Sequence, residues 1–203
     1  MMRLYHSPTS PFVRKVMVFL HEAGLLPETE LVGVAGTPTD PGSMPVSLNP
    51  LGKIPALVVE EGRTLYDSRV ICRYLDARSG AGLYPKGDAL WDTLVIEATA
   101  DGIMEAAVLM VYETRLRPEE ARFEPWVEGQ WRKIARALDA LDTRHIATLD
   151  QGFGAAQIAT ACALGYLDFR LGSRDWRAGR PQLAAWAQAA LLRPSLAESA
   201  PPG

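Results

Sequence analysis

The sequence predicts an α/β domain followed by an all-helical domain. Two observations support this prediction. Short strand patterns alternate with helical patterns over about the first 80 residues, whereas every periodic segment from Asp88 onward repeats near 3.6 residues. Between the two regions, residues 80–87 contain three glycines and Pro85, a composition typical of a linker. We therefore expect domains at residues 1–79 and 88–203, joined by a linker at residues 80–87.

The first domain is expected to contain four short strands and two helices. The first helix is indicated by Val13, Val16, Met17 and Leu20, which recur at helical spacing before Gly24 ends the pattern. Two short strands flank Glu61-Gly62, which indicates a hairpin. In chain order, we expect a strand at 3–6, a helix at 11–24, a strand at 29–34, a loop at 36–45 with an extra helical turn before residue 48, strands at 56–60 and 63–66, and a helix at 67–78.

Apolar stripes at helical spacing predict the remaining helices and their buried faces. Helix 67–78 is expected to bury Val70, Ile71, Tyr74 and Leu75. In the second domain, the stripes are Trp91, Leu94, Val95 and Ala98, continuing toward Met104 and Val108; Trp131, Ile134, Ala135, Leu138 and Leu141; Ile158, Cys162, Gly165, Tyr166 and Phe169; and Leu183, Trp186, Ala187 and Ala190.

Composition and charge exclude several classes of function. The 203 residues carry 21 basic and 24 acidic side chains, a net charge of -3, without a basic cluster, so a nucleic-acid surface is not expected. No apolar stretch approaches the roughly 18 to 20 residues of a membrane span, and none near the start is long enough for a signal peptide. Cys72 and Cys162 lie in apolar helical patterns, which favours a reduced, cytoplasmic protein without a disulfide or metal staple. The expected partner is a small molecule or a second copy of the chain.

The segment Ser10-Pro11-Phe12 lies where the first strand leads into the first helix. Proline fits the first helical position, and the serine hydroxyl can accept a hydrogen bond from an unpaired backbone N–H as an N-cap. The same geometry can bind a ligand, because a helix N-terminus presents N–H groups and about half a positive charge to an anion. A thiol bound there would have a lowered pKa. The residues themselves leave both interpretations open.

Two further segments also have a structural and a functional interpretation. In Asn49-Pro50-Leu51-Gly52-Lys53-Ile54-Pro55, the last proline can enter the strand through a cis bond, or it can turn the Ile54 backbone outward toward an extended peptide ligand. In Tyr66-Asp67-Ser68, either polar residue can cap the next helix. Alternatively, Ser68 and the helix amides can hold a ligand carboxylate, with Asp67 available to a ligand ammonium group.

Taken together, the three segments resemble the thioredoxin-like N-terminal domain of the cytosolic glutathione transferases. They occur in the family's succession, S-P-F-x-x-(K/R), then N-P-x-G-x-(I/V)-P, then (E/D)-S. The helical remainder resembles the C-terminal domain of that family, so the likeness covers essentially the whole chain. It implies a glutathione transferase fold, with an α/β thioredoxin-like domain and an all-α helical-bundle domain.

The resemblance implies that glutathione is the co-substrate and that Ser10 hydrogen-bonds and activates its thiol, as in the serine-type classes. Thr9 is an alternative hydroxyl one residue earlier, and Tyr5 is close enough in the sequence to be considered. We favour Ser10 because the N-cap faces the position toward which the helix dipole points.

The family's pattern also implies how the rest of the tripeptide is bound. Lys53 would lie near the glycine carboxylate, and Ile54 would pair its backbone with the cysteinyl unit, next to a cis Pro55. Asp67 and Ser68 would hold the γ-glutamyl end.

Serine rather than cysteine at the first strand-to-helix junction favours conjugation, because a hydroxyl cannot exchange disulfides. The expected reaction is the addition of the glutathione thiolate to a small hydrophobic electrophile. Peroxide reduction or thioether cleavage at the same site is an alternative, and a non-catalytic glutathione-binding or structural protein is another.

The resemblance places the electrophile between the domains, against the helix that follows the linker. The residues expected to line its pocket are Tyr5, Phe12, Met104, Val108, Met110, Val111 and Tyr112. A Met and Val stripe at this spacing also fits simple core packing. Glu105, Glu113 and Arg115 are close enough in the sequence to line the mouth, but the sequence does not determine their direction.

The chain departs from the family at the start of the buried helix of the second domain. Most members have Ser or Thr there, followed three residues later by Asp, whereas this chain has Gly154 and Gln157. Gln157 can still reach back to a backbone N–H, so we expect a loss of at most about 1–2 kcal/mol relative to a full capping box. The resemblance also implies a homodimer, and twofold symmetry is the commonest oligomeric arrangement in any case.

Overall fold

The structure is a computed structural model that describes residues 1–202 and, at Glu61, only the backbone. It divides into two compact units, residues 1–84 with 197–202 and residues 85–196. The first unit is α/β and the second is all-helical, as the sequence predicts. The return of residues 197–202 to the first unit is not predicted by the helical pattern. Gly203, the last residue of the predicted second domain, lies outside the described residues.

Four strands of the first unit form one mixed sheet in the order β2-β1-β3-β4. β1 (Met2–His6) pairs in parallel with β2 (Thr29–Gly33) and antiparallel with β3 (Ala56–Val58), which pairs antiparallel with β4 (Thr64–Leu65). The predicted hairpin is confirmed, although its two strands are shorter than expected and are joined by a 3₁₀ turn at Glu60–Gly62. β1 is a central strand, and its Leu4 is fully buried.

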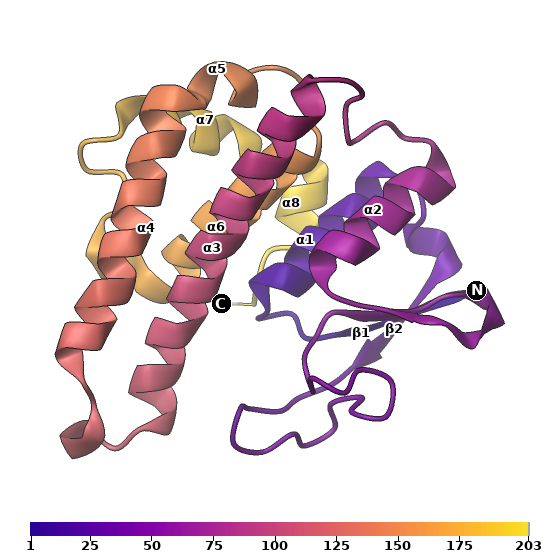
Figure 1. Ribbon diagram of the computed structural model, residues 1–203, viewed down its shortest axis with the longest axis horizontal. Helices are drawn as coiled ribbons and strands as arrows, with labels where there is room; N and C mark the ends of the chain where they lie inside the picture. Colours follow the sequence, from indigo (N-terminus) through magenta and orange to yellow (C-terminus); the bar gives the residue numbers. More distant parts are fainter. Residues whose placement is uncertain (203) are drawn as a thin grey trace. The chain divides into compact units, whose positions relative to one another are not determined.

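Two helices, α1 (Pro11–Glu22) and α2 (Ser68–Ser79), lie on the same face of the sheet (Figure 1). Proline starts α1 as expected, and the chain leaves it through Gly24, whose φ of 69° is readily adopted only by a residue without a side chain. The predicted apolar face is confirmed for Val13, Val16 and Leu20, which are all buried.

The face of α2 differs from the prediction by about one position. Val70 is 47% exposed and Tyr74 is half-buried, whereas Ile71, Cys72 and Leu75 are fully buried. Cys72 is buried in the way that a small apolar residue is. The spacing of the larger side chains Val70 and Tyr74 indicates a stripe that is rotated away from this buried face.

The segment between β2 and β3 is irregular. Residues 34–55, all of which the structure describes, contain turns and no regular helix, and one helical turn is present at 45–49, near the end of the region where an extra turn is expected. Its first part folds back on itself: the Ser43 N–H donates to the Ala35 carbonyl at 2.9 Å, and the Ser43 hydroxyl accepts from the Ala35 N–H at 2.9 Å. A side chain at Gly36 would approach the Pro41 carbonyl oxygen to 2.4 Å, so glycine is required for this closure.

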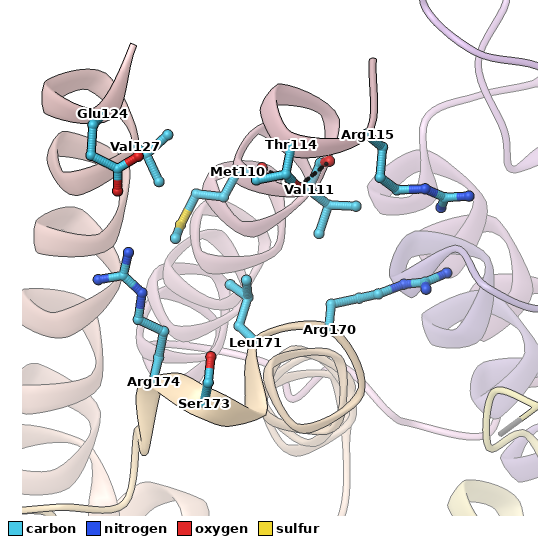
Figure 2. Close-up of a pocket in the computed structure, with 10 residues that line it drawn as sticks. All are labelled: Met110, Val111, Thr114, Arg115, Glu124, Val127, Arg170, Leu171, Ser173 and Arg174. Carbon is cyan, nitrogen blue, oxygen red and sulfur yellow. Dashed lines mark hydrogen bonds between the residues drawn. The ribbon is translucent and has the colours of Figure 1, made fainter. Parts of the chain in front are cut away.

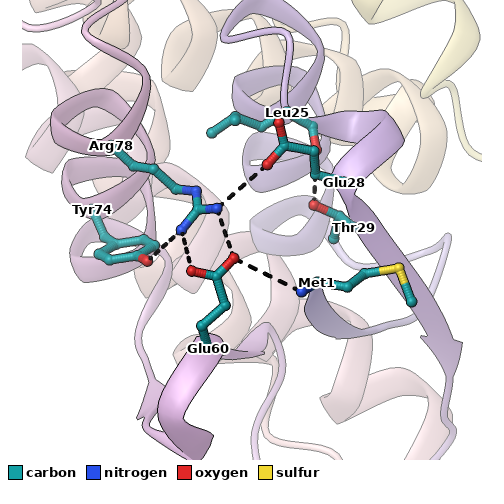
Figure 3. A network of polar contacts seen from close by, with 7 residues as sticks. All are labelled: Met1, Leu25, Glu28, Thr29, Glu60, Tyr74 and Arg78. Atoms are coloured by element: carbon teal, nitrogen blue, oxygen red, sulfur yellow. Dashed lines mark hydrogen bonds and ion pairs between the residues drawn. The ribbon is translucent and has the colours of Figure 1, made fainter.

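A polar network connects α2 to one end of the sheet (Figure 3). Arg78, in the last turn of α2, donates to Glu60 at 2.8 Å and to Glu28 at 3.3 Å, and also to the Tyr74 hydroxyl at 3.3 Å. The Arg78 guanidinium lowers the pKa of the Glu60 carboxyl. Glu28 precedes β2 and Glu60 follows β3, so the network marks the end of the sheet where β1 and β2 begin.

The second unit is built on two long helices and one buried helix. α3 (Ala89–Leu116) and α4 (Glu124–Arg144) run side by side (Figure 1), and both α3 and the shorter α7 (Pro181–Ala190) contact α6 (Ala155–Leu171). Two one-turn helices complete the chain, α5 (Ile146–Leu149) and α8 (Pro194–Glu198). The predicted stripe of α4 is confirmed by Ile134, Leu138 and Leu141, which are fully buried.

Two helices of the second unit differ from simple amphipathic patterns. Residues 155–167 of α6 are buried without interruption, so the predicted stripe describes only part of its contact surface. In α3 the predicted stripe is wrong at its start, because Trp91 is 65% and Val95 54% exposed, whereas Ile96 and Ala100 are fully buried. Apolar residues occur all around this helix, so helical spacing alone does not select its buried face.

Candidate functional site

The register of the sheet brings three segments of the first unit to one end. Tyr5 near the end of β1 pairs with Ala56 at the start of β3, and Leu65 at the end of β4 pairs with Leu57. The loop after β1, the proline before β3 and the residues after β4 therefore meet at the same end, opposite the Arg78 network. These are the three segments that the sequence singles out, with Ser10, Pro55 and residues 66–68.

Ser10 is the N-cap of α1. Its backbone is extended (φ -85°, ψ 123°), and its hydroxyl oxygen accepts a hydrogen bond from the Val13 N–H at 3.3 Å. Within residues 1–202, the half-buried Ser10 side chain makes no second hydrogen bond, so its hydroxyl hydrogen remains available as a donor. The structural cap is thus present, and it leaves the donor needed by an anion at the helix N-terminus.

The other candidate residues near the first segment are Thr9, Tyr5 and Phe12. The Thr9 hydroxyl lies 3.4 Å from that of Ser7, so it is engaged within its own turn. Tyr5 is half-buried and points to the side of β1 opposite Leu4, because side chains alternate along a strand. Phe12 is half-buried in the first turn of α1.

A buried asparagine shapes the loop before β3. Asn49 is 1% exposed, its amide donates to the Lys53 carbonyl at 2.7 Å, and its side-chain oxygen accepts from the Leu51 N–H at 3.1 Å. The Ile54–Pro55 bond that follows is cis, as the resemblance implies. In the described part of the chain, the backbone N–H and C=O of Ile54 form no hydrogen bond, and Lys53 is exposed.

Asp67 and Ser68 begin α2. Asp67 is the N-cap, and its carboxylate accepts from the Arg69 N–H at 3.0 Å and from the Arg69 guanidinium at 3.2 Å. Asp67 is exposed, whereas Ser68 is 2% exposed at the first helical position. The Tyr66–Asp67 bond is also cis, which the sequence does not predict.

In the second unit, a cavity of about 340 Å³ opens between α3, the start of α4 and the end of α6 (Figure 2). Its lining residues are Met110, Val111, Thr114, Arg115, Glu124, Val127, Arg170, Leu171, Ser173 and Arg174. Of the predicted pocket residues of α3, Met110 and Val111 line this cavity. Met104 is fully buried, and neither Val108 nor Tyr112 is among the lining residues.

Glu113, near the end of α3, has a different role from Arg115. Glu113, 9% exposed, accepts from the Arg117 guanidinium at 2.9 Å and from the Phe123 N–H at 3.0 Å, so it joins the end of α3 to the start of α4. Arg115 does line the cavity. Arg170 and Arg174 also line the cavity and are not among the residues expected from the sequence, although two arginines four positions apart at the end of a helical stripe are a visible signal. Such residues are common where a helix ends, so the signal was not specific.

The altered capping motif of α6 is half-formed. The Gln157 side-chain oxygen accepts from the Gly154 N–H at 3.0 Å, and its amide donates to the carbonyls of Thr148 at 2.9 Å and Gln151 at 3.2 Å. Gln157 therefore performs the back-capping role expected from the sequence and also anchors the preceding loop. Glycine supplies no side-chain oxygen for the other half of the box.

Among residues 1–202, no cluster of three or more His, Cys, Asp or Glu side chains is placed to hold a metal ion. None of the helices in that range is both long and apolar enough to span a lipid bilayer.

A thioredoxin-like domain with a mixed sheet, joined to a helical domain, defines the glutathione transferase class of folds. Profiles of the glutathione S-transferase N-terminal and C-terminal domains match residues 9–78 and 124–189. An uncharacterized GST-like protein of Escherichia coli K12, YibF, is 38% identical over 99% of both chains. The chain belongs to the glutathione S-transferase family.

Solved structures agree with this assignment. A glutathione transferase family member of Pseudomonas fluorescens Pf-5 with bound glutathione is 48% identical over the full length of both chains, with a TM-score of 0.98. The structure of a Pf-5 family member with bound S-(propanoic acid)-glutathione, also 48% identical over both full lengths, gives a TM-score of 0.93. The predicted fold class is thereby confirmed.

Proposed function

We propose that the chain is a glutathione transferase that adds the thiolate of glutathione to small electrophiles. The observation that carries this proposal is the meeting of three segments at one end of the sheet, where the Ser10 hydroxyl caps α1 beside the cis Ile54–Pro55 bond and the start of α2. The bound glutathione of the 48% identical Pseudomonas relative supports a site for the same tripeptide here.

In the proposed mechanism, the glutathione sulfur lies at the N-terminus of α1 and accepts a hydrogen bond from Ser10. A hydrogen bond to a charged group contributes about 1.5–3 kcal/mol, which corresponds to a lowering of the thiol pKa by about one to two units. The helix dipole acts in the same direction. From an ordinary thiol pKa of about 8.5, this brings the thiolate, the reactive nucleophile, close to neutral pH.

The remainder of the tripeptide is assigned to the other two segments. The unpaired N–H and C=O of Ile54, held beside cis Pro55, would pair with the cysteinyl backbone, and exposed Lys53 would attract the glycine carboxylate. The N-terminus of α2, with Ser68 and Asp67, would hold the carboxylate and the ammonium group of the γ-glutamyl end. Tyr5 and Phe12 remain candidates for contact with the electrophile, together with Met104, Val108, Met110 and Tyr112.

Conjugation is preferred to redox chemistry because Ser10 cannot form a mixed disulfide. S-(propanoic acid)-glutathione, bound by the Pseudomonas relative, is a thioether of the kind that thiol addition forms and thioether cleavage consumes. Thioether lyase or peroxidase activity at the same thiolate is therefore the second candidate.

We also propose that the chain is a cytoplasmic homodimer. The two buried cysteine thiols support the cytoplasmic location. The exposed apolar side chains of Trp91 and Val95 on α3 support the homodimer.

The test compares turnover of chlorodinitrobenzene by the unmodified chain, Ser10→Gly and Thr9→Val, together with retention on immobilised glutathione. Glycine is a tolerated N-cap that costs only a few tenths of a kcal/mol relative to serine, so Ser10→Gly removes the hydroxyl while keeping the helix. We expect its turnover to fall by about tenfold to a hundredfold, with retention preserved and Thr9→Val nearly unchanged.

Other outcomes identify the alternatives. A loss confined to Thr9→Val would assign the thiol to that hydroxyl. Turnover of cumene hydroperoxide, or release of glutathione from a thioether, without conjugation would favour the second candidate. Retention on glutathione without any turnover would leave a binding protein.

A further inference from the structure

The cavity of the second unit has two chemically different ends (Figure 2). At one end, Arg174 is neutralised, because its guanidinium forms an ion pair with Glu128 and is also attracted by Glu124. At the other end, Arg115 from the last turn of α3 and Arg170 from the last turn of α6 extend in the same direction. Met110, Val111 and Leu171 lie between the two ends.

The positive end has no counter-charge of its own. Among the residues that the structure describes, no carboxylate pairs with Arg115 or Arg170. The Nε atom of Arg170 is buried and has no hydrogen-bond partner in that range, although the guanidinium stacks 3.9 Å from the centre of the Phe169 ring. An unpaired buried donor is costly, and a planar guanidinium is suited to bidentate binding of a carboxylate.

The pKa of the neighbouring Tyr166 phenol is influenced by both arginines. Burial raises the pKa of Tyr166 to about 12, and the positive charges of Arg170 and Arg115 partly oppose that rise. Tyr112 also acts on Tyr166, so its hydroxyl belongs to the same cluster. Both arginines therefore act on one buried phenol, and they line the same cavity as the apolar side chains of Met110, Val111 and Leu171.

We propose that this cavity binds the carboxylate of a small organic acid, with its apolar body on Met110, Val111 and Leu171 and its carboxylate on Arg115 and Arg170. The inference does not depend on the proposed transferase function, because every residue that it uses belongs to the second unit. Arg115 and Arg170 are the specificity-determining residues of this ligand site, since they contact the carboxylate.

The full chain is first saturated with glutathione. Nitrobenzoate and nitrobenzamide are then titrated into it in separate experiments, and the affinity of each is measured at equilibrium. The two ligands have nearly the same shape, and only the first is charged. We expect nitrobenzoate to bind at least about tenfold more tightly, and we expect added salt to reduce that preference. Equal affinity for the two ligands would overturn the inference.

Variants locate the effect. Arg115→Gln combined with Arg170→Gln is expected to abolish the preference for nitrobenzoate, whereas Arg136→Gln, which removes an exposed charge of α4 outside the cavity lining, is expected to keep it. Arg115→Gln alone changes an exposed position and should not affect folding. We expect it to reduce the logarithm of the affinity ratio between nitrobenzoate and nitrobenzamide by about half. An undiminished preference in Arg115→Gln and in the double variant would contradict the inference.

Two further comparisons separate this inference from the proposed function. If arginine-dependent binding of nitrobenzoate occurs but neither chlorodinitrobenzoate nor chlorodinitrobenzamide is turned over, the carboxylate site stands and the transferase function fails. If chlorodinitrobenzene is turned over but nitrobenzoate and nitrobenzamide bind with equal affinity, the function stands and the carboxylate site fails. A preference seen only without glutathione would show that the arginines bind the tripeptide, which would also overturn the inference.

Discussion

The side-chain amide of Asn49 donates a hydrogen bond of 2.7 Å to the carbonyl oxygen of Lys53, and the same side chain accepts one of 3.1 Å from the Leu51 N–H. Both bonds are made by a residue that is 1% exposed. The loop that leads to the cis Ile54–Pro55 bond is therefore held from inside the fold, while Lys53 remains exposed to a ligand. Asn49 positions the loop without being placed to touch the ligand itself.

Asn49→Asp separates the two bonds of this side chain, because aspartate can still accept from Leu51 but cannot donate to Lys53. We expect a loss of stability of about 1–3 kcal/mol and a weaker affinity for glutathione, since a buried carbonyl loses its donor. Denaturant unfolding and glutathione titration measure the two effects. Pro50→Ala, at the exposed next position, serves as the control. Unchanged stability and affinity in Asn49→Asp would show that the hydrogen bond does not hold the loop.

Gly154→Ser restores the missing half of the capping box of α6. The backbone of Gly154 is extended (φ -136°, ψ -156°), a conformation that serine adopts, and Gln157 already supplies the reciprocal hydrogen bond. We expect a gain of about 0.5–1 kcal/mol, from the cap and from the lower entropy of the unfolded chain, and a rise in Tm of about 1–4 °C, measured by calorimetry. Gly154→Ala provides no hydroxyl and is a poorer N-cap than glycine, so it is expected to give no gain. An equal effect of serine and alanine would mean that no cap is formed.

Trp91 tests the proposed homodimer. Its side chain is 65% exposed, and Val95 on the next turn of α3 is 54% exposed. A charge at an apolar contact of this kind is costly to bury, so Trp91→Glu is expected to convert a dimer into a single 22 kDa species in sedimentation. Leu192→Glu, at a side chain that is 79% exposed elsewhere in the second unit, is expected to leave the dimer intact. A monomeric unmodified chain would refute the homodimer directly.

Tyr166 is expected to limit stability at alkaline pH. Its pKa is raised by burial to about 12 from a value of 10.0, so the phenol stays neutral in the folded chain while it ionises in the unfolded chain. The unfolded state therefore binds fewer protons above pH 10, and stability falls as the pH rises from 10 toward 12. Tyr166→Phe removes this contribution and should lose less stability over that interval in denaturant unfolding. If the free energy of unfolding falls equally with pH in the unmodified chain and in Tyr166→Phe, Tyr166 is not the cause.

The elements of the first unit were predictable because local signals agree with the tertiary structure there. Ser10-Pro11 marks the start of α1, Gly24 marks its end, and Glu61-Gly62 lies in the turn of the hairpin. Those signals depend on backbone conformation within a few residues, which sequence patterns describe well. The segment 34–55 lacked a periodic pattern, and its closure depends on a close backbone approach at Gly36 that no local pattern reveals.

Buried faces were less predictable than helix positions. Val70 and Trp91 were assigned to the core by spacing, yet both are exposed, because Cys72 and Ile96 supply the buried face instead. Where apolar residues surround a helix, the identity of its neighbours decides which side is covered. The sequence of one chain does not contain that information in its periodicity.

Some residues of the candidate site could be predicted from the sequence and others could not. Ser10, Ile54–Pro55 and Asp67-Ser68 were found because each belongs to a short motif with a defined backbone role. The roles of Arg115 and Arg170 depend on how different helices pack, so no motif assigns them, whereas Asn49 bonds to Leu51 and Lys53 in its own loop and only its burial is hidden from the sequence. All three are polar side chains in a stretch of sequence that is otherwise apolar or rich in turn residues. Such side chains are common, so they indicate a site only when the structure shows what surrounds them.

The most direct test of the mechanism is the pKa of the glutathione thiol when it is bound, followed by the ultraviolet absorbance of the thiolate as the pH is raised. We expect the bound thiol to ionise about one to two pH units below free glutathione, and we expect Ser10→Gly to return most of that shift. A bound thiol that ionises at the same pH as free glutathione, or a lowered pKa that Ser10→Gly leaves unchanged, would contradict the assignment of Ser10 as the activating hydroxyl.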